Sequence, residues 1–155
     1  MISASAVLSI KMKLFFVTIL LAVLGTTYGK VFTKCELVRL LAANGFPRSQ
    51  LPDWICLIQN ESRYDTSAWN TKNRDGSKDY GIFQINNYYW CAEGKVGANE
   101  CKLQCSSLRD DDIGDDMRCA LFIYRRHQFN AWNAWKDKCR GKPKPSVDEC
   151  FVVGK

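Results

Sequence analysis

Histidine is nearly absent from this chain of 155 residues, which contains only His127. A zinc site built from paired cysteines and paired histidines is therefore not expected. The chain also lacks the roughly 20 consecutive apolar residues that span a bilayer, because its main apolar run, "LFFVTILLAVL", is too short. It has no internal repeat and no linker-like segment. These absences favour a single domain and argue against stable insertion in a membrane.

The apolar run belongs to a segment that has the order of a secretory signal peptide. Lys11 and Lys13 precede the run, and the small-residue stretch "GTTYG" follows it. We predict a signal peptide over residues 1–29 that is cleaved at its end, with Met12 as an alternative start because such leaders begin near their lysines. The mature chain, residues 30–155, then has 126 residues, the size of one domain.

The formal charge of the whole chain is +6, and loss of the leader leaves 20 basic and 16 acidic side chains, a net charge of +4. A mild positive charge favours anionic partners, and bacterial walls, nucleic acid and membrane surfaces are all anionic. A secreted protein that is simply basic explains the charge equally well. Charge therefore leaves the partner open.

Cysteine is abundant by contrast, and all eight cysteines follow the predicted leader. An even number in an exported chain predicts four disulfides. Eight cysteines allow 105 connectivities, so spacing alone does not pair them. The cysteines are Cys35, Cys56, Cys91, Cys101, Cys105, Cys119, Cys139 and Cys150.

Helical patterns stand on both sides of a polar, turn-rich middle. Thr33 and Glu36 predict a capping box in front of "CELVRLLAA", and Asn44-Gly45 ends that helix. A second helix is predicted to begin around Pro52. Apolar residues at helical spacing are Trp54, Leu57 and Ile58 in this helix, Ile113, Met117, Leu121 and Tyr124 in a later one, and Trp132 and Trp135 in a short last one.

The middle of the chain, residues 66–90, predicts a small β-hairpin. The pair Asp75-Gly76 favours a tight turn in front of the β-rich stretch "DYGIFQIN", which we expect to form one strand. Helices around a small antiparallel hairpin make an α+β fold.

Two carboxyl groups have contrasting expected surroundings. Glu61 follows Ile58 by three residues and Leu57 by four, so its carboxyl projects from the apolar face of the second helix. Desolvation there raises the pKa of a carboxyl, unless the side chain turns into solvent at the helix end. Asp79 opens the predicted strand, where Gly81 leaves space beside it and polar neighbours suit an ionised group. These neighbours are Ser77, Gln84 and Asn86.

A protonated carboxyl and an ionised carboxyl are what glycoside hydrolysis requires. One donates its proton to the leaving oxygen, and the other meets an oxocarbenium-like centre. Flat aromatic faces that suit sugar rings are also present, although core packing explains most aromatic residues. The aromatic residues nearest to the proposed site are Tyr88, Tyr89, Trp90 and Trp132.

The sequence resembles the c-type (chicken-type) lysozymes of the lysozyme/α-lactalbumin family. The resemblance rests on "KVFTKCEL", "NESRYDTSAWNTKNRDGSKDYGIFQINNYYWC", "NAWNAW" and the register of all eight cysteines, and it covers essentially the whole mature chain. It implies a single domain over residues 30–155, with a mainly helical lobe, a small antiparallel β-hairpin lobe and a cleft between them. It also implies the disulfides Cys35–Cys150, Cys56–Cys139, Cys91–Cys105 and Cys101–Cys119.

The resemblance implies a bacteriolytic glycosidase that needs no cofactor for catalysis. Its substrates would be peptidoglycan, cleaved with retention at the β-1,4 bond between N-acetylmuramic acid and N-acetylglucosamine, and chitin-like oligosaccharides. Glu61 resembles the general acid, and Asp79 resembles the nucleophile or charge stabiliser. The resemblance further implies a secreted, extracellular monomer with no nucleic-acid partner. The positions that resemble the cleft lining are Asn73, Gln84, Asn86, Tyr89, Trp90, Ala131 and Trp132, of which Trp132 resembles the indole near the acid.

Two local features accompany this resemblance. The stretch "YRRHQF" stands where familiar members carry an acidic residue at the cleft rim, and the segment between Cys119 and Trp132 is about one residue shorter than theirs. The "NES" sequon at Asn60 lies on the helix of the proposed acid, so we expect it to carry no glycan.

Five aspartates fall within seven positions of "RDDDIGDDMRC". A helix start accounts for about two of them through capping and the helix dipole, and the others would repel one another. The spacing differs from an EF-hand, but "SSLRDDDIGDDMRC" resembles the calcium loop of α-lactalbumin and of the minority of lysozymes that bind calcium. The resemblance implies a structural Ca²⁺ bound by carbonyls of Ser107 and Asp112 and by side chains of Asp110, Asp115 and Asp116.

Two other functions stay open on the sequence. One is a non-catalytic, calcium-binding regulator similar to α-lactalbumin, against which the joint presence of Glu61 and Asp79 argues. The other is a cationic membrane-active antimicrobial protein, which would need neither carboxyl group. Replacing Glu61 by glutamine separates enzymatic from membrane action.

Overall fold

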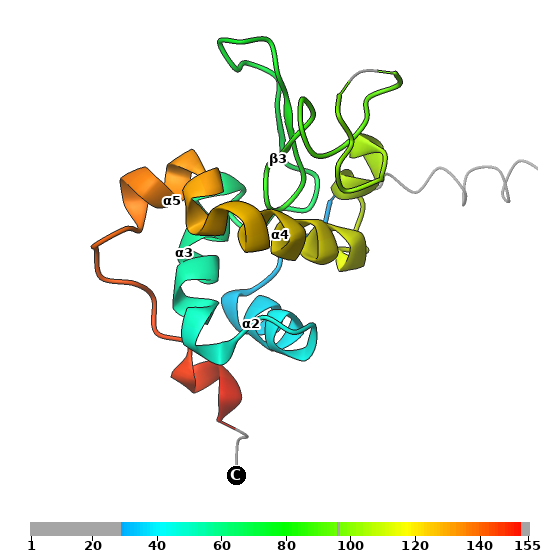
Figure 1. Cartoon of the computed structure of the whole chain (residues 1–155). Helices are drawn as coiled ribbons and strands as arrows, with labels where there is room; N and C mark the ends of the chain where they lie inside the picture. The colour runs from blue at the N-terminus through cyan, green and yellow to red at the C-terminus, as the bar shows by residue number, and fades with distance from the viewer. Residues whose placement is uncertain (1–28, 96, 153–155) are drawn as a thin grey trace, which may run out of the picture.

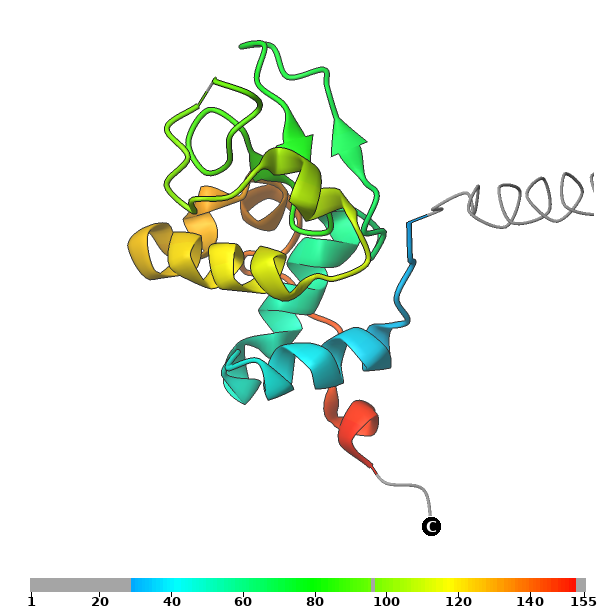
Figure 2. The same ribbon diagram turned by 90° about the vertical axis from the view of Figure 1, so that its right-hand side faces the viewer.

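The structure, a computed structural model, describes residues 29–95 and 97–152 (Figure 1). The predicted signal peptide, with its alternative start at Met12, lies outside the described residues except for Gly29. Within the described ranges, no helix has the length and apolar character needed to cross a membrane. Figures 1 and 2 show two lobes, a helical one and one made of loops and short strands, which confirms the expected α+β class.

The helices, labelled as in Figure 1, form one lobe. The predicted capping box is confirmed, because the N–H of Glu36 donates to the Thr33 hydroxyl while the Glu36 carboxylate accepts from the N–H of Thr33. The second predicted helix begins at Leu51, with Pro52 in its first turn, where the missing N–H costs nothing. Trp132 stands one residue before the last helix rather than inside it. The α-helices are α2 (Lys34–Ala43), α3 (Leu51–Glu61), α4 (Gly114–His127) and α5 (Asn133–Lys138).

Short 3-10 helices connect these elements and end the described chain. They are η1 (Arg48–Gln50), η2 (Cys105–Arg109), η3 (Gln128–Ala131) and η4 (Asp148–Phe151).

The second lobe contains a three-stranded antiparallel sheet in the order β1-β2-β3. The strands are β1 (Trp69–Asn70), β2 (Asp79–Tyr80) and β3 (Ile85–Asn86). The prediction of a single strand over "DYGIFQIN" is therefore wrong. The chain reverses between β2 and β3, where Gly81 (φ +72°) and Gln84 (φ +49°) adopt left-handed conformations that end a strand.

The expected open space beside Gly81 is also absent. A Cβ at this position would lie 1.7 Å from the carbonyl oxygen of Leu108 and 2.8 Å from Oδ1 of Asp116. Glycine is required here because η2 packs directly on the turn after β2. The missing side chain of Gly81 thus allows the two backbone segments to lie in contact.

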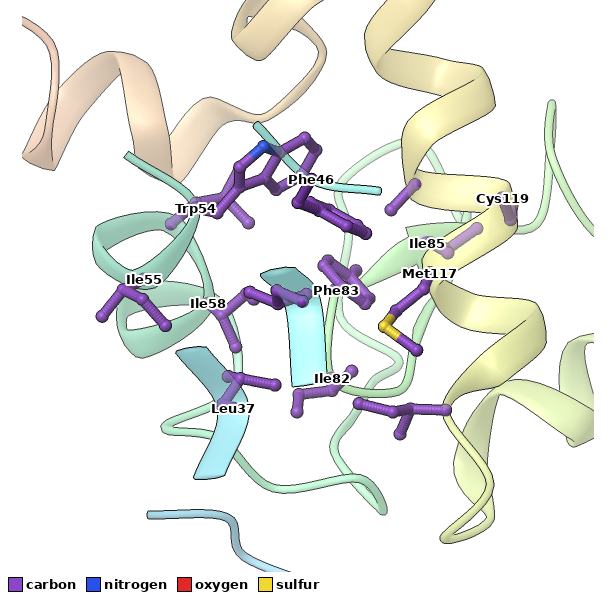
Figure 3. Packing of buried hydrophobic residues seen from close by; sticks show 14 of the residues in the cluster. Leu37, Phe46, Trp54, Ile55, Ile58, Ile82, Phe83, Ile85, Met117 and Cys119 are labelled. Atoms are coloured by element: carbon purple, nitrogen blue, oxygen red, sulfur yellow. The ribbon is translucent and has the colours of Figure 1, made fainter. Parts of the chain in front are cut away.

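A core of buried side chains lies between α3 and α4 and continues under the sheet (Figure 3). Trp54 is fully buried at its centre, and its ring meets those of Phe46, Phe83, Phe129 and Trp132 with centroid separations of 4.9, 6.0, 4.8 and 5.4 Å. All four contacts are edge-to-face, the geometry that aromatic quadrupoles favour. The Trp54 ring is therefore in contact with residues of both lobes.

Four disulfides connect these elements, and no free cysteine remains in the described part of the chain. Their pairing is the one that the family resemblance implies. The longest span joins α2 to η4 across 115 positions of sequence. The bridges are Cys35–Cys150, Cys56–Cys139, Cys91–Cys105 and Cys101–Cys119.

Replacing Cys35 and Cys150 together by alanine should lower the free energy of unfolding by about 2–5 kcal/mol, because the bridge restricts the unfolded chain. Urea unfolding of the variant and the parent at one pH measures the loss. Equal unfolding midpoints, or peptide mapping of the parent that finds another pairing, would contradict the expected role of this bridge.

Candidate active site

A cleft of about 630 Å³ contains both proposed catalytic carboxyl groups and every position that the family resemblance implied for its lining. One wall comes from the sheet and the segment after β3, and the other comes from the end of α3, from Ile123 of α4, from the end of η3 and from the start of α5. The predicted residues in its lining are Glu61, Asn73, Asp79, Gln84, Asn86, Tyr89, Trp90, Ala131 and Trp132.

Glu61 is the last residue of α3, and its carboxyl faces the cleft. Leu57 and Ile58, one turn earlier, are fully buried, so the helix face that carries Glu61 is the face that packs inward. Burial raises the pKa of Glu61 to about 7, the negative charge of Asp79 adds to the increase, and the backbone N–H of Ala134 opposes it. Glu61 is therefore largely protonated in mildly acidic solution.

Asp79 lies in the opposite kind of environment, because three side-chain amides donate to it. Asn70 and Asn73 donate to Oδ2 at 3.1 and 2.8 Å, and Asn86 donates to Oδ1 at 2.8 Å. The register of the sheet explains two of these contacts, since Asp79 pairs with Asn70 on β1 and with Asn86 on β3. An ionised carboxylate, which only accepts hydrogen bonds, suits this set of donors.

Ser77 fixes two of the three amides. This side chain is 1% exposed, and its hydroxyl oxygen accepts from Asn73 at 3.1 Å and from Asn86 at 2.8 Å. Its hydroxyl donates to Asp75 Oδ1 at 2.7 Å, a bond that lowers the pKa of Asp75. Each of the two amide nitrogens thus gives one hydrogen to Ser77 and one to Asp79, which uses its full donor capacity.

Two residues near Asp79 have other roles than the sequence suggested. Gln84 lines the cleft but does not bond to Asp79, because its side-chain amide donates to the carbonyl of Gly81 at 2.9 Å. Tyr88 is not part of the cleft lining, and its hydroxyl donates to the carbonyl of Asp75 at 2.8 Å. Both side chains hold turns of the β lobe in place.

Trp132 connects the two walls of the cleft at its back. Its ring is 5% exposed, and its Nε1–H donates to the carbonyl of Phe83 at 2.9 Å. Since Phe83 belongs to the turn between β2 and β3, this bond ties the β lobe to the segment that leads into α5. The bond also avoids the cost of leaving a buried indole N–H unpaired.

Two aromatic residues of the cleft lining, Tyr89 and Trp90, follow β3. Tyr89 is 59% exposed, and the Trp90 ring next to it packs edge-on against His127 at 5.6 Å and Phe122 at 6.4 Å. His127 is the last residue of α4, so the "YRRHQF" stretch supports an indole of the cleft lining. Arg126 forms an ion pair with Glu100.

Sequence reasoning missed Asn70 as a partner of Asp79. Asn70 contacts Asp79 because the two residues pair across β1 and β2. Each strand has only two residues, too few to show the alternating pattern by which a strand is predicted. It also missed Asn133 and Ala134, which line the cleft next to Trp132. Tertiary packing places these two residues in the cleft, so no local sequence pattern predicts them.

The acidic loop is partly explained by its own hydrogen bonds. Asp110 Oδ1 accepts from the N–H of Asp112 at 2.9 Å, and Asp112 Oδ1 accepts from the N–H of Gly114 at 3.1 Å. Asp116 is different, because it is 1% exposed and neither carboxylate oxygen has a hydrogen-bond partner in the described part of the chain. Burial raises the pKa of Asp116 to about 9, and the charge of Asp115 adds to the increase.

The expected calcium site is not confirmed. Among residues 29–95 and 97–152, no three or more acidic, histidine or cysteine side chains form a group able to hold a metal ion. The implied ligands are Ser107, Asp110, Asp112, Asp115 and Asp116, of which Asp116 is the buried carboxyl without a partner.

A model of the C-type lysozyme/alpha-lactalbumin family matches residues 30–150. The chain belongs to this family. Over 139 residues it is 54% identical to Lysozyme c-1 of Anopheles gambiae, an alignment that covers 88% of this chain and 98% of that protein. Over 121 residues it is 45% identical to a lysozyme of Galleria mellonella, covering 78% of this chain and all of that protein.

The fold is also similar to the crystal structure of lysozyme from Equus asinus. The TM-score is 0.70 at 41% sequence identity, and the match covers 74% of this chain and 92% of that one. With relatives named lysozyme matched over most of the chain, the expectation of an enzyme is confirmed, and the chain is a lysozyme-type glycoside hydrolase.

The activity of this lysozyme-type enzyme should fall as pH rises through about 7, because Glu61 then loses the proton that an acid catalyst donates. The measurement is kcat/KM on peptidoglycan at constant ionic strength. Thermal midpoints over the same pH range serve as the control for unfolding, and a flat profile would contradict the assignment.

Proposed function

We propose that this enzyme hydrolyses the β-1,4 bond between N-acetylmuramic acid and N-acetylglucosamine in peptidoglycan, with retention of configuration. The observation that carries the proposal is the contrast between the two carboxyls of one cleft. Burial raises the pKa of Glu61 to about 7, while Asp79 accepts three amide hydrogen bonds. One group is suited to donate a proton and the other to carry negative charge.

In the first step, the protonated Glu61 gives its proton to the glycosidic oxygen as the bond to the anomeric carbon breaks. The Asp79 carboxylate bonds to that carbon or stabilises its positive charge. In the second step, Glu61, now ionised, takes a proton from water, and the hydroxide oxygen replaces Asp79. Two displacements at one carbon restore the original configuration, and both carboxyl groups return to their starting protonation states.

The amide network supports the role of Asp79 because it sets where the carboxylate points. Asn73 and Asn86 are themselves held by Ser77, so Asp79 can turn only if several hydrogen bonds break together. A carboxylate that is already oriented does not need to reorganise as positive charge develops on the sugar. No cofactor is needed for these steps.

The cleft also supports an extended polysaccharide as substrate. Exposed Tyr89 and the braced Trp90 offer rings for stacking, and the side-chain oxygens of Asn73, Asn86 and Gln84 can accept hydrogen bonds from sugar hydroxyls. Chitin-like oligosaccharides share the N-acetylated sugars and are proposed as further substrates. Four disulfides fit an extracellular protein, and we propose a secreted monomer with no nucleic-acid partner.

Replacing Glu61 by glutamine should abolish release of sugars from purified peptidoglycan, since the amide cannot donate the proton. The variant should fold normally because the two side chains have nearly the same shape, and circular dichroism with a thermal scan checks this.

An NMR time course with the parent enzyme on a chitin oligosaccharide should show a product with the β configuration at the new end.

An inverted product would overturn the retaining mechanism. Killing of bacteria by the folded Glu61→Gln variant at the level of the parent would favour the cationic membrane-active alternative instead.

We further propose that the acidic loop binds a structural Ca²⁺. Carboxylates of Asp110, Asp115 and Asp116 would provide side-chain oxygens, and Ser107 and Asp112 would provide backbone carbonyls. The buried Asp116 carboxyl supports this, because it has no hydrogen-bond partner among the described residues and a cation would supply one. The ion lies outside the steps of hydrolysis and would act on stability alone.

Millimolar calcium should raise the thermal midpoint relative to excess chelator, and a site at about 1,000 times its dissociation constant would add roughly 4 kcal/mol. Asp115→Ala should remove this difference. Asp137→Ala is the control, because Asp137 is an exposed aspartate on α5, away from the loop. Identical midpoints of the parent in calcium and in chelator would show that the aspartates only cap the helix.

A further inference from the structure

The backbone nitrogen of Lys30 lies in a polar site that we call the N-terminal clamp, formed by Thr66 Oγ1 and Asp111 Oδ1. The nitrogen is 2.9 Å from Thr66 Oγ1 and 2.7 Å from Asp111 Oδ1. The Thr66 hydroxyl donates to the same Asp111 oxygen at 2.8 Å, so the three atoms form a closed triangle. In Figure 2 the blue segment at the start of the described chain runs past the loop that precedes α4.

The backbone nitrogen of Lys30 faces two hydrogen-bond acceptors but has only one hydrogen to donate. A peptide nitrogen carries one hydrogen, which Thr66 and Asp111 must share. An ammonium group carries three, so it can give one to each acceptor and keep one for solvent. A hydrogen bond from a cation to a carboxylate is also stronger than one between neutral groups. The site therefore suits a charged amine better than an amide.

The predicted cleavage after Gly29 creates such an amine on this atom. Hydrolysis of the Gly29–Lys30 bond consumes one water, leaves the new carboxylate on Gly29 and leaves the amine on Lys30. The α-amino group is largely protonated at neutral pH. The inference depends on this cleavage point and is independent of the glycosidase mechanism.

We propose that the N-terminal clamp receives the α-ammonium group that signal-peptide removal creates, so that maturation converts a shared amide contact into an ion pair with Asp111. Asp111 thereby differs from the other aspartates of its loop. Asp110 and Asp112 accept hydrogen bonds from N–H groups of the loop itself, whereas Asp111 accepts from residues 81 and 45 positions earlier in the sequence.

The clamp is preorganised by the chain around it. Thr66 is fully buried, and its N–H donates to the carbonyl of Lys30 at 3.0 Å. Val31 forms an isolated antiparallel bridge with Asp65. The first described residues are thus held as a short extended segment against residues 64–66, which fixes the nitrogen in front of its acceptors.

The residue before the clamp has little room. A Cβ on Gly29 would lie 2.3 Å from the Cβ of Ser67, a distance that forces a displacement. A glycine in front of Lys30 keeps the observed geometry and moves only the positive charge, whereas a methionine there also adds a clash. A chain extended by glycine therefore isolates the effect of the charge.

The experiment compares four chains in excess chelator, so that cation binding to the neighbouring aspartates does not contribute. Two begin at Lys30 and two carry one extra glycine before it, and each pair consists of the parent and Asp111→Asn. The chain that begins at Lys30 should have the highest thermal midpoint, about 1–4 °C above its glycine-extended form. Asp111→Asn should lower the midpoint of the unextended chain by a similar amount and that of the extended chain by much less.

Asp112→Asn is the matched control, because it removes the same charge from the same loop but leaves the clamp intact. Its effect on the midpoint should be equal in the extended and unextended chains. Peptidoglycan hydrolysis should be the same in all chains with the extra glycine or Asp111→Asn, so a failure of the catalytic proposal is seen separately.

Three results would overturn the inference. The first is equal midpoints with and without the extra glycine, and the second is an Asp111→Asn effect that does not depend on it. The third is a mass spectrum of the exported protein that places its first residue elsewhere than Lys30.

Discussion

Both walls of the cleft depend on the packing of the buried Trp54 indole. Its ring touches Phe83 from the turn of the sheet and Trp132 from the segment before α5. The indole N–H itself is buried without a partner among the described residues, which costs about 1–3 kcal/mol. Several edge-to-face contacts at about 0.5–1.5 kcal/mol each, beyond the area that they bury, outweigh that cost.

This packing explains how two similar side chains acquire different chemistry. The α3 helix must present its apolar face to the core, and Glu61 is the next residue on that face, so it is withdrawn from water. Asp79 stands instead on a sheet whose neighbouring strands end in asparagines, so amide hydrogens replace the water that it loses. The difference between the two carboxyl groups comes from the elements that carry them.

Local signals in the sequence predicted the helices well. The capping box at Thr33 and Glu36 depends on residues three positions apart, and α3 follows from a single apolar stripe and Pro52. The cleft lining and the disulfide pairing came from the family resemblance, since spacing leaves both open. The structure places the predicted lining residues in the cleft, and their roles in binding and catalysis stay predictions.

What the sequence did not predict depends on contacts between distant segments. The expected strand breaks at Gly81, where the carbonyl oxygen of Leu108, 27 positions later, occupies the place that a Cβ would take. Asn70 contacts Asp79 through strand register, and Asp111 accepts a hydrogen bond from the backbone nitrogen of Lys30, 81 positions earlier. A propensity or a period of apolar residues contains no information about such pairs.

Because Asp79 is held by asparagine side chains, slow chemical modification of those side chains would limit how long the site keeps its geometry. Asparagine is among the thermolabile residues, and its slow deamidation turns an amide donor into a carboxylate. At Asn73 or Asn86 that change would remove hydrogen bonds to Ser77 and Asp79 and place a second negative charge beside the first. The core around Trp54 contains none of these groups, so an ageing molecule would stay folded after its cleft had ceased to work.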